Sequence, residues 1–446
     1  METLLTKFTD EELNCILTYK QLLENNKIDN FIRHLDVDDT FADQELKKKL
    51  SEIKAEIKSK VDELGKKIDE ISVIQKPVRI YIDGVFDLVH SGHFNAIRQA
   101  KKLGDQLICG VNSDMDVLKV KGPTLLTCSE RAALVKACKW IDEVHQDTPY
   151  TPTLEVLDMY QCNYCSHGDD ICLDENGHGV YDEFIKQNKL KIFKRTEGVS
   201  TTVIIGRLLM SLKDKINDLD IDAEEKKKLR ENLEELEKFK QNQKPVMSSF
   251  LATSWRITEF SNHKLPSPTD KIIYICGDFD ILHCGYIEAL ESAKKEGDFL
   301  YVGVFDDETA HKYRGQNKNC PILNMNERVF NLLAMKNVDE IVFGAPFKIT
   351  EDMIRLLKID KVIRFDCKSK ANEKEKTWRK LEEEIYEIPE KMGIVKRINL
   401  DVELSNDTLI EKLWTHKDLY LKKYLKKARE EMISIEEREN HDIKEI

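Results

Sequence analysis

The sequence lacks long hydrophobic runs, and nowhere do apolar residues continue for the roughly 20 positions that a membrane-spanning helix requires. Its first residues, METLLTKFTDEELNC, are acidic and polar and do not have the pattern of a signal peptide. We therefore expect a cytoplasmic protein with no transmembrane segment.

An excess of positive charge is also absent, since the formal net charge is -12 at pH 7. Domains that bind nucleic acid usually present a basic face that neutralises phosphates. We therefore expect no nucleic-acid partner, although an isolated basic pocket is compatible with this balance.

Paired cysteine motifs of the zinc-site type are missing too. The 11 cysteines are odd in number and scattered, which fits free thiols better than a disulfide framework. Cys162 and Cys165 form a CxxC, but no second pair follows at zinc-site spacing. We predict buried thiols here rather than a metal or redox site.

What the sequence does contain is an internal duplication. The segment around His90 recurs around His283, and ERAALVKACKWIDEV recurs further on as ERVFNLLAMKNVDEI. A chain of 446 residues is long enough for two or three domains. We interpret the repeat as a duplicated domain rather than a solenoid of short units.

Each copy alternates short apolar strands with amphipathic helices. VRIYI, GHFNAIRQAKKLG and DQLICGVN in the first copy correspond to KIIYI, GYIEALESAKKEG and DFLYVGVF in the second. This alternation predicts an α/β fold with two tandem doubly wound, Rossmann-like parallel-sheet domains. A ligand should then lie beyond the carboxyl ends of the strands.

The expected domains are the first copy over residues 76–212 and the second over 270–415. We expect residues 1–75 to form a helical extension, because apolar residues recur there at helical spacing: Leu46, Leu50, Ile53, Ile57 and Val61. This pattern favours a docking or coiled-coil helix, through which chains could form a homo-oligomer, over a membrane-surface helix. Residues 213–269 and 416–446 are rich in charge, and we predict a solvated helical linker and a helical tail.

The stretch DGVFDLVHSGH, residues 83–93, joins the first strand to the first helix. A turn at Gly84 and a helix that starts near Gly92 would aim backbone N–H groups at one point, which suits a phosphate. His90 and His93 flank that point and can donate ring N–H groups to phosphate oxygens. The alternative for this spacing is a capped helix start with a zinc-binding or core histidine.

A second motif, KRTEGVSTT, precedes the helix TTVIIGRLL. Its side chains that can bind phosphate are Arg195, Ser200, Thr201 and Thr202. Two anion-binding helix starts in one sheet predict a polyphosphate substrate.

GVFDLVHSGH together with RTEGVSTT resembles the cytidylyltransferase family, and a duplication with one intact site resembles its members that act on phosphoethanolamine. The resemblance covers roughly residues 77–412. It implies that a phosphate oxygen of phosphoethanolamine attacks the α-phosphorus of CTP, with Mg²⁺ present, to give CDP-ethanolamine and pyrophosphate for phosphatidylethanolamine synthesis. A phosphocholine enzyme and a non-catalytic nucleotide-binding scaffold are the alternatives.

The resemblance also implies roles for single residues. His90 and His93 would stabilise the transition state, and Lys121 would contact the phosphates. The nucleotide would be bound by Gly84, Val85, Phe86, Asp87, Gly92, Arg195, Thr196, Gly198, Ser200, Thr201 and Thr202. Asp87 has two interpretations, as a helix cap and as a residue that orients the motif.

The amine of the acceptor needs a site for a cation. The resemblance implies that an aromatic face and a carboxylate form this site. The aromatic candidates are Trp140, His167 and Tyr181, and the carboxylate is Asp169 or Asp170. The loop HGDDICLDENGHGVY is longer than in the choline pattern, which leaves the choice between the two aspartates open. Core packing is the alternative role for Trp140.

The second copy departs from this set. Tyr286 replaces His93, Arg314 replaces Lys121 and Arg364 replaces His167. Tyrosine can donate a hydrogen bond but cannot become cationic as histidine can. We predict a catalytically silent domain that supports the first, with weak CTP binding as a further hypothesis.

Overall fold

The computed structural model describes residues 77–169, 179–196, 200–211, 213, 216, 222–242, 254–314, 320–367, 383–400 and 406–426, with 52, 55 and 59 as single residues. The chain divides into two compact units, one of residues 1–78 with 262–265 and one of the remainder, which contains both copies. The predicted amino-terminal helices and the homo-oligomer that they suggested fall almost entirely outside the described residues.

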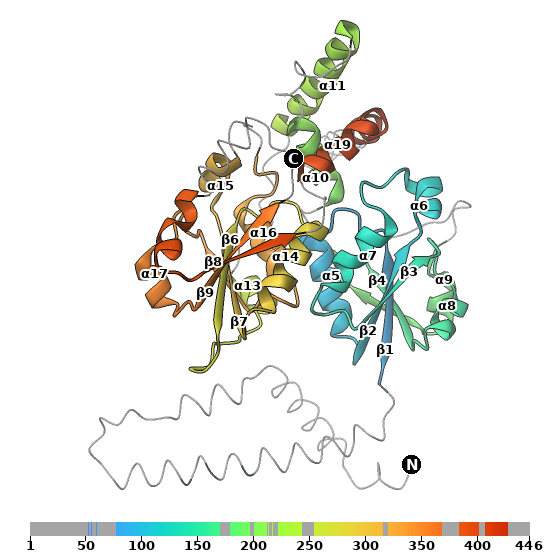
Figure 1. Ribbon diagram of the computed structural model, residues 1–446. Coiled ribbons are helices and arrows are strands. Elements are labelled where there is room, and N and C mark those ends of the chain that lie inside the picture. The colour runs from blue at the N-terminus through green and yellow to red at the C-terminus, as the bar shows by residue number, and fades with distance from the viewer. Residues whose placement is uncertain are drawn as a thin grey trace, which may run out of the picture. The chain divides into compact units, whose positions relative to one another are not determined.

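The first copy forms a five-stranded parallel sheet in the order β3-β2-β1-β4-β5 (Figure 1). Its strands are β1 (Arg79–Gly84), β2 (Gln106–Asn112), β3 (Glu143–Thr148), β4 (Tyr164–Gly168) and β5 (Leu190–Phe193). The strand order reverses between β1 and β4, which makes the carboxyl ends of these two strands the expected place for a ligand.

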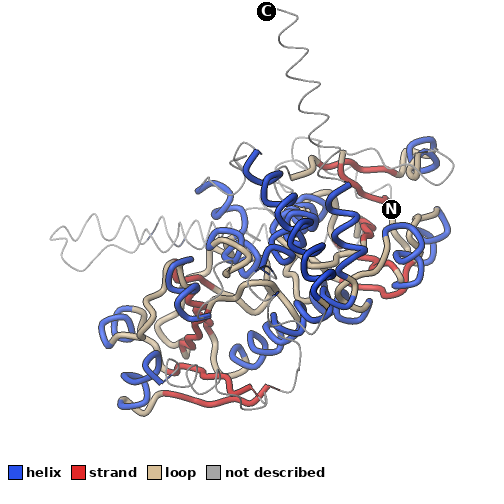
Figure 2. The backbone as a smooth tube through the Cα atoms, turned by 90° about the horizontal axis from the view of Figure 1, so that it is seen from above, coloured by secondary structure: helices blue, strands red, loops and turns tan. Residues whose placement is uncertain are grey.

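The second copy repeats this sheet in the order β10-β9-β6-β7-β8. Its strands are β6 (Ile272–Gly277), β7 (Phe299–Val304), β8 (Glu340–Phe343), β9 (Lys361–Cys367) and β10 (Val395–Leu400). Figure 2 shows the strands of each sheet with helices beside them. The prediction of two tandem doubly wound domains is confirmed.

Helices connect the strands in both copies. In the first copy they are α5 (Ser91–Lys101), α6 (Asp114–Lys121), α7 (Cys128–Lys136), α8 (Leu154–Met159), α9 (Asp182–Lys186) and α10 (Thr201–Ser211). In the second they are α14 (Cys284–Lys294), α15 (Asp307–Arg314), α16 (Met325–Leu333), α17 (Glu351–Leu356) and α19 (Asn406–Thr415). Of the helices in the described ranges, none combines the length and apolar composition that crossing a membrane requires.

The region between the copies contains α11 (Ala223–Asn242) and α13 (Ser254–Phe260). A helix, as expected for this segment, is present in α11, and it is solvated on part of its surface only. Leu229, Leu233 and Leu236 are buried and recur at helical spacing, so one face of α11 is an apolar contact surface. Because charged residues are so frequent in this segment, the three leucines were not recognised as a buried face from the sequence.

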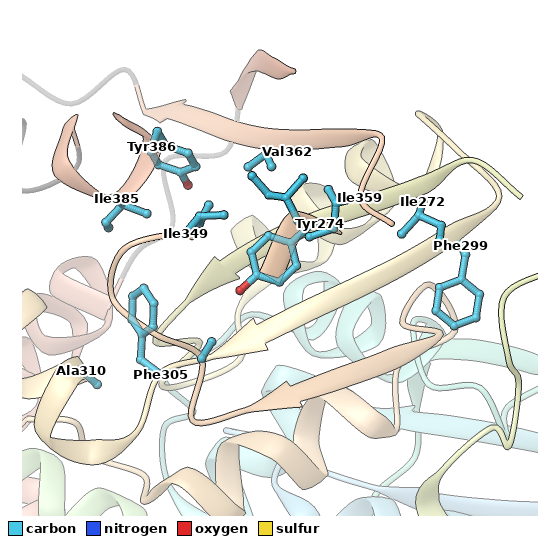
Figure 3. Close-up of a cluster of buried hydrophobic side chains, with 12 residues drawn as sticks. Ile272, Tyr274, Phe299, Phe305, Ala310, Ile349, Ile359, Val362, Ile385 and Tyr386 are labelled. Atoms are coloured by element: carbon cyan, nitrogen blue, oxygen red, sulfur yellow. The ribbon is translucent and has the colours of Figure 1, made fainter. Parts of the chain in front are cut away.

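Both cores use a tyrosine of the first strand over a glycine of the second. A Cβ atom at Gly110 would lie 2.2 Å from the Tyr81 hydroxyl, and one at Gly303 would lie 2.0 Å from the Tyr274 hydroxyl. Figure 3 shows Tyr274 within the apolar cluster of the second sheet. Only glycine leaves room for the ring at these positions.

The two copies join through matching backbone segments. The Lys139 N–H donates to the Ala334 carbonyl at 2.9 Å, and the Lys336 N–H donates to the Ala137 carbonyl at 2.9 Å. The contact is thus reciprocal, like that of a two-fold dimer, although it lies within one chain.

A buried arginine braces each copy. Arg131 is fully buried, and its guanidinium donates to the carbonyls of Val85 and Asn112 and to the Asp114 carboxylate at 2.6 Å. It thereby ties the turn after β1 to the end of β2. Arg328 makes the equivalent contacts with Asp278 and Asp307 in the second copy.

We expect Arg131→Met and Arg328→Met each to lower the free energy of unfolding by about 3 to 5 kcal/mol, because buried acceptors and a carboxylate lose their partner. Lys136→Met, at an exposed position of α7, is the control. Denaturant titration measures the change, and a loss below about 1 kcal/mol for the arginine variants would contradict the bracing role.

Candidate active site

The candidate site lies where β1 turns into α5. Phe86 and Leu88 adopt left-handed backbone conformations, with φ of 53° and 48°, which turn the chain sharply after the strand. A Cβ at Gly84 would come within 3.1 Å of the Phe86 ring, and that ring lies beside His93 with 5.7 Å between centroids. The turn therefore delivers both histidines to the carboxyl end of β1.

His90 is the N-cap residue of α5. Its Nδ1 accepts a hydrogen bond from the Gly92 N–H at 3.1 Å, so in the neutral ring the proton is on Nε2. Nε2 lies 3.5 Å from the Thr201 hydroxyl oxygen, at the start of α10. The two helix starts that the motifs predicted to bind anions thus meet at His90.

The two imidazoles face each other with 4.0 Å between ring centroids. Nδ1 of His93 is buried and has no hydrogen-bond partner in the described part of the chain. Burial, reinforced by Lys121 and Arg195, lowers the pKa of His93 to about 4. Burial and the neighbouring His93 and Arg195 also lower the pKa of His90, so both rings are neutral donors at neutral pH.

Asp87 does not cap α5, which corrects one of its two interpretations. Its buried carboxylate accepts the N–H groups of Leu125 at 2.9 Å and Leu126 at 3.1 Å. The carboxylate thus fastens the loop that follows Lys121 to the histidine motif. In the second copy, Asp280 binds the N–H groups of Ile322 and Leu323 in the same way.

The second motif is tied to α5 by polar contacts. The Asn95 amide donates to the Thr196 hydroxyl at 2.8 Å, and the Ser200 hydroxyl accepts the Val203 N–H at 3.3 Å in the first turn of α10. Thr202 lies in the same turn. Gly198 is outside the described residues.

The proposed acceptor residues come from β4 and the segments after it. The His167 ring lies 4.5 Å from the Tyr181 ring, and its Nδ1 is 3.0 Å from the Gly168 carbonyl oxygen. The Asp169 carboxylate accepts the Arg195 N–H at 2.8 Å, which links this edge to the phosphate motif. Asp170 is outside the described residues.

Trp140 does not belong to this group. It precedes β3, which begins at Glu143, and so lies at the amino edge of the sheet, opposite His90. Its ring packs edge-on against Phe260 with 5.0 Å between centroids, and Lys139 Nζ lies 5.1 Å from its centroid. Core packing, the alternative role, describes its position.

Two further residues at the site were not predicted. Tyr150 follows the carboxyl end of β3, and Lys121 Nζ lies 5.3 Å from its ring centroid. Asp83, at the end of β1, accepts a hydrogen bond from the Asn112 amide at 3.3 Å, and burial raises its pKa to about 7 against the opposing effects of Asn112 and Lys121. In the sequence, the features that could have identified them were an aromatic residue and an acidic residue at the carboxyl ends of strands.

The second copy fills the equivalent position differently. The Tyr286 hydroxyl donates to the Asp278 carboxylate at 3.0 Å, and Asp278 is buried where the first copy has Val85. Arg364, which replaces His167, is buried and lies 5.4 Å from the Tyr386 ring centroid. A buried carboxylate and a buried guanidinium thus stand in the second copy where the first copy has Val85 and His167.

No group of three His, Cys, Asp or Glu side chains able to hold a metal ion occurs among the described residues. Mg²⁺ is commonly held by one or two carboxylates together with substrate phosphates. Asp83 supplies one buried carboxylate at the site. Asp83 could therefore serve as a protein ligand of such an ion.

Comparisons with known proteins agree with this geometry. The family model described as cytidylyltransferase-like matches residues 81–250 and 274–437, one match in each copy. A Dictyostelium discoideum protein named ethanolamine-phosphate cytidylyltransferase is 39% identical over 363 residues, covering 81% of this chain and 98% of that protein. The protein of the same name from Arabidopsis thaliana is 38% identical over 365 residues, covering 80% of this chain and 85% of that protein.

A protein of Arabidopsis thaliana named choline-phosphate cytidylyltransferase 2 is 45% identical, but over 139 residues, which are 30% of this chain and 45% of that protein. The match to proteins named for ethanolamine phosphate extends over both copies, whereas the match to this choline-named protein is partial. The chain belongs to the cytidylyltransferase-like family and, within it, to the ethanolamine-phosphate cytidylyltransferases.

Proposed function

We propose that the chain transfers a cytidylyl group from CTP to phosphoethanolamine. A phosphate oxygen of phosphoethanolamine forms a bond to the α-phosphorus of CTP, and the bond from that phosphorus to the bridging oxygen of the β-phosphate breaks. The products are CDP-ethanolamine and pyrophosphate. The electron pair of the broken bond leaves on pyrophosphate, so no side-chain nucleophile is needed.

The observation that carries the proposal is the meeting of two helix starts at a histidine pair of which His90 is buried. The Nε2 proton of His90 is a donor beside the Thr201 hydroxyl, which itself donates to the Asp87 carbonyl at 3.3 Å, and the His93 ring faces His90. Backbone N–H groups at helix starts and donors of this kind stabilise charge that develops on phosphoryl oxygens.

The surrounding cations supply the remaining stabilisation. Lys121 and Arg195 both act on the electrostatics of His93, so they lie near the point where phosphates would bind. We assign Lys121 to the phosphates at the reacting end, and Arg195 with Ser200 and Thr201 to the β- and γ-phosphates. Mg²⁺ would neutralise charge on CTP when it is bound.

The acceptor's ammonium group would lie at the edge formed by His167 and Tyr181. An aromatic face attracts a cation when it lies within about 6 Å, and the Tyr150 ring, now near Lys121, is a further candidate. Asp169 adds a carboxylate that is tied to Arg195. In this proposal the ammonium end of the acceptor contacts aromatic and acidic groups, and its phosphate end contacts cationic groups.

We expect wild-type protein with CTP and Mg²⁺ to release pyrophosphate when phosphoethanolamine is added. His93→Ala should lower kcat/KM by about 100-fold or more, because a donor to the developing charge is lost. Tyr286→Phe, at the matching position of the second copy, should leave turnover unchanged. A pyrophosphate-release assay measures all three proteins, with EDTA and phosphocholine as separate arms.

Preference for phosphocholine would move the assignment to the choline-phosphate enzymes. Nucleotide binding without turnover of either acceptor would favour a scaffold. Turnover that persists in EDTA would remove Mg²⁺ from the proposal.

A second expectation concerns Asp83. Its folded-state pKa of about 7 lies above the ordinary value of 3.8, so the folded protein binds this proton more tightly than the unfolded chain does. That contribution to stability is present at low pH and is lost as pH rises from about 4 to 7. Asp83→Asn should therefore gain stability over wild type across this window, by up to about 4 kcal/mol.

Thermal unfolding of wild type and Asp83→Asn at a series of pH values measures this difference, with the exposed Asp158→Asn as control. If the difference in stability between wild type and Asp83→Asn stays constant from pH 4 to pH 8, the expectation is contradicted, because the pKa of Asp83 is then close to its ordinary value.

A further inference from the structure

The second copy anchors one side of the first-copy site through α10. Thr201 begins this helix beside His90, and Arg207 lies further along it. The Arg207 guanidinium donates to the Glu327 carboxylate at 2.6 Å and to the Ile322 carbonyl at 3.1 Å, both in the second copy. The helix that brings Thr201 to His90 is therefore held from the other domain.

The other side of the site is contacted by helical residues 417–426, which follow α19. The Tyr420 hydroxyl donates to the Pro123 carbonyl at 2.9 Å, and the Lys423 ammonium donates to the Lys121 carbonyl at 2.7 Å. Tyr420 is 4% exposed, so loss of this bond would leave a buried hydroxyl unpaired. Burial also raises the pKa of Tyr420, which keeps it a donor.

These two contacts lie on either side of a flexible residue. Gly122 stands between Lys121 and Pro123 with φ of +88°, and nothing lies within 4 Å of the position that a Cβ would take. Glycine has more conformational freedom than other residues, so the direction of the Lys121 side chain depends on how its neighbours are fixed. Lys423 binds the backbone carbonyl of Lys121, before Gly122, and Tyr420 binds that of Pro123, after Gly122.

The segment that carries these donors is itself attached at two more places. Lys412 in α19 pairs with the Glu130 carboxylate at 2.9 Å, next to the bracing Arg131. A Cβ at Gly206 of α10 would lie 2.4 Å from the Tyr424 ring, so this helix and residues 417–426 pack closely. The anchor from the second copy and the contacts of residues 417–426 at the start of the tail thus support each other.

We propose that Tyr420 and Lys423 are positioning residues for cytidylyl transfer. They hold the backbone on both sides of Gly122 so that the Lys121 ammonium reaches the phosphates of CTP. The inference rests on the proposed function of the first-copy site and on the role assigned there to Lys121. It gives the second copy a part in the reaction that requires no chemistry at its own altered site.

The test is a double-mutant cycle in the full chain. Tyr420→Phe and Lys423→Met should each lower kcat/KM for CTP by about threefold to tenfold, because each removes one hydrogen bond that fixes the loop. Lys423→Arg, which retains a donor, should recover most of the activity. Lys422→Met, an exposed neighbour on the same helix, should behave as wild type.

The cycle is completed in a Lys121→Ala background, measured with radiolabelled CTP. If Tyr420 and Lys423 act through Lys121, their substitution has no further effect once the ammonium is gone. An equal fold-loss with and without the Lys121 side chain would overturn the proposal, as would wild-type activity in both single variants. Melting temperatures are recorded for every variant, and Lys423→Met carries the test if Tyr420→Phe destabilises the protein.

The outcome also separates this inference from the proposed function. Full activity of Lys121→Ala would remove Lys121 from the reaction and with it the basis of the positioning role. Loss of activity in Lys121→Ala, combined with wild-type behaviour of Tyr420→Phe and Lys423→Met, would overturn the inference alone.

Discussion

The geometry of the candidate site depends on a buried guanidinium. Arg131 has no solvent exposure, and a charge withdrawn from water in this way is tolerated only when several acceptors surround it. Two of its acceptors are the carbonyls of Val85 and Asn112, at the ends of β1 and β2. The turn that delivers His90 cannot move without taking the Val85 carbonyl away from the buried guanidinium. Arg328 imposes the same constraint on the second copy, where the histidine pair has become a histidine and a tyrosine.

The duplication has a structural consequence beyond repetition. Arg207 from the first copy pairs with Glu327 of the second, and Lys412 from the second pairs with Glu130 of the first. Each copy thus sends the helix after its last strand to the other, as two subunits of a symmetric dimer would. Fusion into one chain lets the two halves differ in chemistry while they keep this exchange. The first copy retains the histidine pair, and the second copy, which has lost one of these histidines, retains its contacts with the first.

Most of the fold could be predicted from the sequence because alternating strands and amphipathic helices are local patterns. The meeting of the two motifs at His90 followed from the rule that ligands bind beyond the carboxyl ends of parallel strands. Trp140 was misplaced because KWIDEV lies between a helix and a strand, and local patterns do not show at which end of the strand it falls; Trp140 lies three residues before β3 begins. Asp83 was missed because its burial arises only in the folded chain, and Asn112 and Lys121, which act against the effect of burial on its pKa, are distant in sequence.

The central claim is that one chain contains one working site. The most direct measurement is the stoichiometry of CDP-ethanolamine binding to the complete chain by isothermal titration calorimetry, with His90→Ala as the comparison. The account predicts one product molecule bound per chain, with weaker binding when the imidazole of His90 is removed and unchanged binding to His283→Ala. Two molecules per chain, or binding that weakens in His283→Ala and not in His90→Ala, would contradict it.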